Sequence, residues 1–144
     1  MCLVINKNSV LQQARKDIVG YKLVYKNDDG TYLTPYQKVT VELNKLYHEK
    51  NFTDSYFRLF EKHGGGEKTI TNDAIHFYAD MKSAKKEWLG NSQEILGAII
   101  PMGATFVNGT FDYANTGYPC YASEAVIYRK LTFWERLKLK FIKD

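Results

Sequence analysis

The stretch IVGYKLVYK, residues 18–26, decides the fold class. It is rich in β-branched and aromatic residues, which is typical of a β-strand. The NDDG that follows at 27–30 is a turn signal, because Asn, Asp and Gly tolerate the backbone conformations that tight turns need. A strand of this length that ends in a turn predicts that the chain builds a sheet.

Further strand candidates follow along the sequence. Two short ones come directly after the turn, at 31–37 and 38–44, and Pro35 favours an edge position because proline cannot donate a ladder hydrogen bond. The later candidates are AIHFYA, EILGAIIP, ATFVNGTF and SEAVIYRKL, at 74–79, 94–101, 104–111 and 123–131.

Four short helices are predicted from capping signals and from apolar residues spaced three or four positions apart. The first and the last open on capping boxes, in which a Ser or Thr hydroxyl and a Gln or Glu side chain satisfy free backbone donors. The predicted helices begin at Ser9, at Thr53 or Asp54, at Asp80 and at Thr132, and the first three end near Lys16, the glycines at 64–66 and Gly90.

The order of these elements defines a fold class. Strands come first and last with helices between them, which is an α+β pattern. We therefore predict one domain over residues 1–144, with a mostly antiparallel or mixed sheet of about six strands. Short helices complete it, and an amphipathic helix occupies about 132–143.

The net charge of +4 is concentrated in residues 130–144. Five cations and two carboxylates give that segment +3 and leave +1 for the other 129 residues. A nearly neutral body argues against a nucleic-acid surface, which needs cations spread over one face.

The apolar runs are short. None approaches the ~20 residues that cross a bilayer, so no transmembrane segment is predicted. The opening MCLVINKNS has no basic segment before its apolar part, unlike a signal or transit peptide. The expected location is cytoplasmic.

The sequence contains no recognisable metal-binding or phosphate-binding motif. The histidines at 48, 63 and 76 and the cysteines at 2 and 120 lack the spacing of a metal site, so no metal and no cofactor are predicted. In a P-loop the last glycine is followed directly by lysine, and a strand precedes the loop. Here Glu67 separates the glycines at 64–66 from Lys68. This segment is interpreted as a helix stop and connector.

The strand around His76 is the first candidate for a binding site. Alternation places His76 and Tyr78 on one face and Ile75 and Phe77 on the other. If Ile75 and Phe77 face the core, His76 and Tyr78 face a groove or water. The 11 tyrosines, among them Tyr121, are explained either by strand propensity or by a pocket for a base or sugar.

The segment LTFWERLKLKFIKD, residues 131–144, is the second candidate. It predicts an amphipathic helix with an apolar stripe and basic residues around it. Such a helix packs on its own sheet, lies on a membrane, docks on an acidic partner or self-associates. The stripe consists of Phe133, Trp134, Leu137 and Phe141.

Several phrases resemble a family of small uncharacterised proteins of bacteriophages and intestinal bacteria. They are spread over most of the chain, and the resemblance implies an origin in a mobile element or a gut bacterium without an established activity. The phrases are Met1-Cys2-Leu3, the segment 14–22, Pro35-Tyr36, Ile75-His76-Phe77-Tyr78, the segment 100–109 and Tyr121-Ala122-Ser123.

A second resemblance is to the ADP-ribosyltransferase fold. That fold orders a basic or His residue on an early strand, a middle strand with hydroxyl residues and a late strand led by a glutamate. The resemblance implies an enzyme acting on NAD or a related nucleotide, with Glu124 stabilising charge that develops on the ribose. The residues in matching order are Lys22, His76, Tyr78, Ser123 and Glu124.

Three hypotheses follow. The favoured one is a non-enzymatic binding or interaction module, an accessory protein of a mobile element or gut bacterium. Its groove, lined by tyrosines and His76, would take a nucleotide-like small molecule or a host protein. The second is an enzyme that uses Glu124, and the third is a structural or assembly protein that forms a homo-oligomer through the C-terminal helix.

Overall fold

The computed structural model describes residues 3–5, 10–35, 38–63, 68–70, 74–88, 92–111 and 117–142. Within these ranges the chain forms twelve strands and three helices, and the strand pairs are antiparallel. The first strands are β1 (Leu3–Ile5), β2 (Gln12–Gln13), β3 (Ile18–Lys26), β4 (Tyr32–Leu33), β5 (Thr40–Val41) and β6 (Leu46–His48). Then come α1 (Phe52–His63), β7 (Lys68–Ile70), β8 (Ile75–Tyr78), α2 (Met81–Lys86), β9 (Gln93–Ile100), β10 (Thr105–Phe111), β11 (Pro119–Ser123), β12 (Ala125–Arg129) and α3 (Phe133–Phe141).

The prediction of a six-strand α+β fold is wrong. In the part of the chain that the structure describes, the protein is mostly sheet, with 43% strand and 21% helix. The main path of the sheet is β6-β12-β9-β3-β8-β11-β10-β1-β7. Off this path, β2 pairs with β10, β4 pairs with β3, and β5 pairs with β4. Five of these strands were not predicted. Four of them, β1, β2, β6 and β7, have two or three residues each, too few to show a period-two pattern, and the fifth is the five-residue strand β11.

The predicted helix at 9–16 does not form in the described part of that segment. Instead, β2 pairs with the start of β10, where Gln13 lies opposite Thr105. Main-chain bonds between Ala14 and residues 103 and 104 continue this contact. Pairing with a distant strand has therefore overridden the local capping signal, whose Ser9 lies outside the described residues.

The other three helix predictions are confirmed at their starts, within two residues. Asp80 caps α2 by accepting a hydrogen bond from the Ser83 amide. That helix ends at Lys86, before the predicted stop at Gly90, which lies outside the described residues. The capping box of α3 forms as predicted, with Thr132 and Glu135 as its two members.

The chain passes from one part of the sheet to another at Glu124. Strand β11 pairs with β8 and β10, but β12, which only Glu124 separates from β11, pairs with β6 and β9. Two hydrophobic clusters result, and along β8 they alternate, with Tyr78 in one and Phe77 in the other. Both faces of β8 are thus buried.

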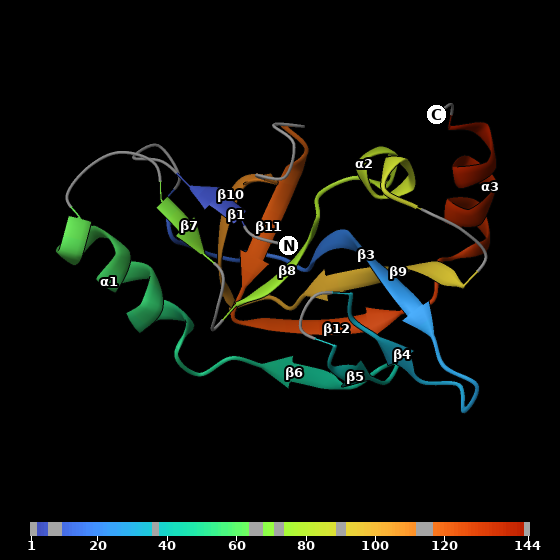
Figure 1. The fold of residues 1–144 in the computed structure, drawn as a ribbon, viewed down its shortest axis with the longest axis horizontal. Coiled ribbons are helices and arrows are strands. Elements are labelled where there is room, and N and C mark those ends of the chain that lie inside the picture. Colours follow the sequence, from blue (N-terminus) through green and yellow to red (C-terminus); the bar gives the residue numbers. More distant parts are fainter. Residues whose placement is uncertain are drawn as a thin grey trace.

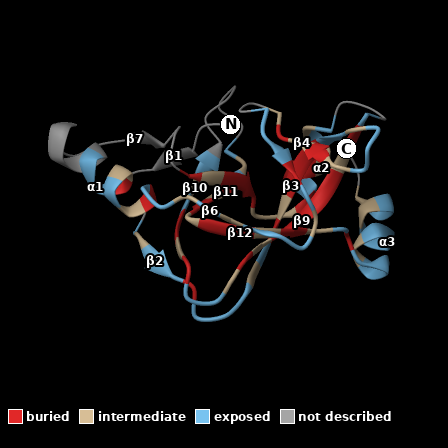
Figure 2. Ribbon diagram, turned by 90° about the horizontal axis from the view of Figure 1, so that it is seen from below, coloured by how far each residue is buried: buried red, intermediate tan, exposed pale blue. Residues whose placement is uncertain are grey.

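The helices lie at the periphery of the sheet. Helix α1 is at one end of the molecule and α3 at the opposite end, with α2 between α3 and the sheet (Figure 1). Colouring by burial shows that α3 has no buried residue, while the central strands are largely buried (Figure 2). Among the described residues, no helix has the length and apolar character needed to cross a bilayer.

Candidate functional site

Lys22 lies on β3, inside the sheet. Its side chain is buried, and its Nζ donates a hydrogen bond to the main-chain oxygen of His76 at 2.5 Å. Burial lowers the pKa of Lys22 from 10.5 to about 8, because the core solvates an ammonium poorly. The amine therefore joins β3 to β8 within the core.

His76 and Tyr78 do not face a groove. Only 5% of His76 and 6% of Tyr78 are exposed, which corrects the expectation that they lie opposite the core. Across the β8–β11 ladder, His76 lies beside Ala122 and Tyr78 beside Cys120, both buried. The alternation was predicted correctly, but the face with His76 and Tyr78 is covered as well.

Tyr121 and Ser123 lie on β11 and have packing roles in the structure. The Tyr121 ring contacts Phe77 and Phe106, with centroids 5.7 and 5.8 Å apart. Ser123 is fully buried, and its Oγ donates to the Ala125 oxygen at 2.7 Å and accepts from the Ala125 amide at 3.1 Å. The serine thus holds the turn between β11 and β12.

Glu124 lies between β11 and β12, where the chain passes from one part of the sheet to another. Its Oε1 accepts a hydrogen bond from the Thr105 amide at 2.9 Å. Its Oε2 lies 3.9 Å from Nε2 of His48, a partner that sequence reasoning did not associate with it. The carboxylate is partly exposed, and its bond to the Thr105 amide fixes the start of β10.

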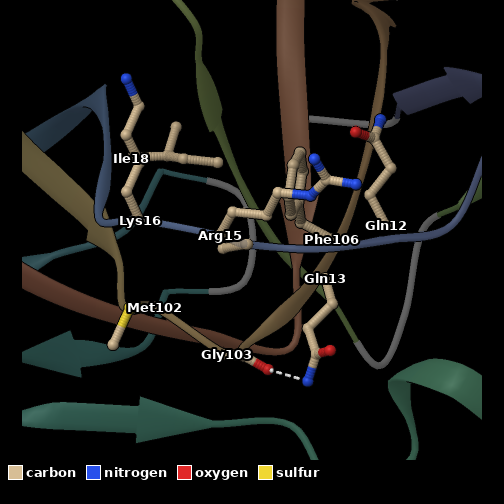
Figure 3. A pocket seen from close by; sticks show the side chains of 9 residues that line it. Gln12, Gln13, Arg15, Lys16, Ile18, Met102, Gly103 and Phe106 are labelled. Carbon is tan, nitrogen blue, oxygen red and sulfur yellow. Dashed lines mark hydrogen bonds between the residues drawn. The ribbon is translucent and has the colours of Figure 1, made fainter.

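A shallow groove lies beside the short strand β2. Its volume is about 730 Å³, and Arg15 and Lys16 give it two exposed cations (Figure 3). Gln13 closes one side by donating from Nε2 to the Gly103 oxygen at 3.0 Å. The lining could accept an anionic group. Sequence reasoning missed it because the segment was interpreted as a helix.

The apolar stripe of α3 lies at the surface. We call Phe133, Trp134, Leu137 and Phe141 the docking face. Their exposed fractions are 63%, 70%, 37% and 76%, so the stripe does not pack on the protein's own sheet. Leu139 and Ile142, on the other side of the helix, pack against the core instead.

The first turn of α3 is fixed by Glu135. This carboxylate accepts hydrogen bonds from Tyr21 at 3.0 Å and from the two terminal nitrogens of Arg129 at 2.6 and 3.2 Å. Burial opposes ionisation of Glu135, but bonds from Arg129, the Thr132 amide and Tyr21 outweigh it and lower its pKa to about 2. Glu135 is thus ionised at neutral pH and joins α3 to β3 and β12.

The last turn of α3 is fixed from α2. The Nζ of Lys85 donates to the main-chain oxygens of Leu139 at 3.0 Å and Ile142 at 2.5 Å. A cation at this position satisfies free carbonyls and complements the helix dipole. Because hydrogen bonds attach both ends of α3 to the rest of the domain, the docking face is held toward solvent.

Comparison with known proteins identifies no relative. The sequence matches no protein-family model, and no curated protein and no solved structure is detectably similar to it. Within the described ranges, no group of three or more His, Cys, Asp or Glu side chains is placed to hold a metal ion. Cys2 and the glycines at 64–66 lie outside those ranges.

Proposed function

We propose that this protein is a non-enzymatic interaction module and that its contact surface is the docking face of α3. One observation carries this proposal. Four large apolar side chains are exposed together on a helix whose other side is bonded to the domain at both ends. The largest contiguous apolar patch on a soluble monomer measures about 300–600 Å² and is often a functional surface.

The patch is large enough for this role. Phe133, Trp134 and Phe141 are 63%, 70% and 76% exposed. Because an aromatic side chain offers about 150–250 Å², these three expose roughly 400 Å². The Phe133 and Trp134 rings also pack edge to face, with centroids 5.4 Å apart, so they present one continuous surface.

The placement of the predicted site residues supports a role other than catalysis. A ligand cannot reach Lys22, His76 and Tyr78 without opening the sheet, because all three are buried. Glu124 already uses one carboxylate oxygen to hold the Thr105 amide. The origin in a mobile element or gut bacterium stays a prediction.

The proposal predicts that α3 retains the protein in larger complexes inside the cell. In a detergent-free extract of expressing cells, we expect most of the wild-type protein to elute at an apparent mass far above its own 16.7 kDa. The double variant Trp134→Ser/Phe141→Ser should elute at the mass of the free protein, because it loses the two most exposed aromatic rings of the docking face. Size-resolved fractionation of the whole extract measures this.

A matched control removes exposed apolar side chains elsewhere. Leu46 on β6 and Phe57 on α1 are 56% and 52% exposed. The variant Leu46→Ser/Phe57→Ser should fractionate like the wild type. The proposal would be contradicted if the wild type eluted at the mass of the free protein, as expected for Trp134→Ser/Phe141→Ser.

A further inference from the structure

We infer that the docking face of α3 attaches to an anionic lipid bilayer surface. This inference rests on the proposed function and specifies the partner. The direction of the stripe, the charges beside it and its area favour this partner.

The docking face is directed away from the domain. Successive residues of an α-helix are rotated by about 100°, which places the stripe roughly 150° from the side that carries Leu139 and Ile142. Those two residues pack against the core. Helix α3 also lies at one end of the molecule, opposite α1 (Figures 1 and 2).

Cations flank the stripe on both sides. On the helical wheel Arg136 and Lys140 lie on one side of it and Lys138 on the other, and all three are exposed. Phe133, Arg136, Leu137 and Lys140 also line a shallow hollow on this surface. Long basic side chains can extend toward lipid phosphates while neighbouring apolar groups enter the acyl boundary.

No free carboxylate of α3 opposes an anionic surface. Residues 133–141 contain one acidic side chain, Glu135. It points toward Arg129 and Tyr21, on the side of the helix that meets the domain. The outward half of α3 is therefore apolar and cationic, which is the charge pattern of an interfacial helix on acidic lipid.

A second copy of the chain fits this surface less well. Two docking faces in contact would bring the same cations, Arg136, Lys138 and Lys140, near their own copies. The patch exposes roughly 400 Å² of aromatic surface, whereas a stable protein interface buries about 800 Å² per partner. A bilayer needs no matching shape, and Trp and Phe are favoured at its interface.

The test is co-sedimentation of the full chain with vesicles. One set contains phosphatidylcholine alone, and the other replaces about a third of it with phosphatidylserine. We expect at least tenfold tighter binding to the anionic set, and weaker binding as salt is raised, since salt screens the cations. Equal binding to both sets would overturn the charge argument.

Two pairs of variants separate the contributions. Trp134→Ser/Phe141→Ser removes apolar surface, and Arg136→Gln/Lys140→Gln removes charge. Each should weaken binding to anionic vesicles at least tenfold. The matched controls are Leu46→Ser/Phe57→Ser and the replacement of exposed Lys26 and Lys50 by Gln, both of which should bind like the wild type. Unchanged binding of either α3 variant would overturn the inference.

Failure here differs from failure of the proposed function. If the wild type ignores anionic vesicles but its large complexes still depend on Trp134 and Phe141, the lipid inference is overturned and an acidic protein becomes the partner. If the wild type also elutes at the mass of the free protein in cell extract, both the lipid inference and the proposed function are overturned. An intact circular dichroism spectrum shows that each variant is folded.

Discussion

Replacing Gly20 with alanine is expected to lower the free energy of unfolding by about 3 kcal/mol, the upper part of the usual cost of overpacking. A Cβ at this position would lie 2.4 Å from Cδ2 of Phe77 and 2.7 Å from the main-chain oxygen of Tyr78. Phe77 is fully buried and the Tyr78 oxygen belongs to β8, so neither can move freely. The glycine is required because β3 lies very close to its neighbour β8 here, beside the pair formed by Tyr21 and Tyr78.

Denaturant unfolding measures this effect, and a second substitution tests its cause. If the clash with the Phe77 ring dominates, Phe77→Leu should cost less stability in the Gly20→Ala background than in the wild type. Val19→Ala, one position away and 38% exposed, is the control and should change stability little. A Gly20→Ala protein within about 0.5 kcal/mol of the wild type would contradict the predicted contact.

The buried amine of Lys22 is expected to make stability rise with pH between about 8 and 10.5. Burial lowers its pKa from 10.5 to about 8. Below pH 8 both the folded and the unfolded chain hold the proton, and the folded state carries a charge in its core. Above pH 8 the folded state releases the proton first, so stability rises by up to about 3 kcal/mol in total.

Lys22→Met isolates this contribution. Tyr21 and Tyr32, whose pKa values burial raises to about 12, weaken the fold as pH rises above 10, but they do so in both proteins. The difference in unfolding free energy between wild type and Lys22→Met should therefore change by about 3 kcal/mol over this range, in favour of the wild type. A difference independent of pH would mean that the amine does not reside in the core.

Local signals predicted the helix starts well. The capping box of Thr132 and Glu135 needs only four consecutive residues, and Asp80 caps α2 through Ser83, three residues away. The same kind of signal failed at Ser9, because β2 instead pairs with β10, more than ninety residues along the chain. Two-residue strands carry too little pattern to compete with such a signal in the sequence.

The candidate site was predictable in part. Spacing identified the stripe of Phe133, Trp134, Leu137 and Phe141, but could not say whether it packs inward. The exposure of the stripe depends on Tyr21, Arg129 and Lys85, which hold the opposite side of α3 from three other elements. Likewise, alternation placed His76 and Tyr78 on one face but could not show that a second core covers that face.

An accessible docking face on α3 is the central requirement of the proposed function. Trp134 reports this directly once Trp88, which is 39% exposed, is replaced by Phe. At a concentration where the chain is monomeric and without vesicles, we predict that Trp134 emits like a water-exposed indole and that acrylamide quenches it nearly as well as free tryptophan. Blue-shifted emission protected from acrylamide would show that the docking face is already covered, and would contradict the account.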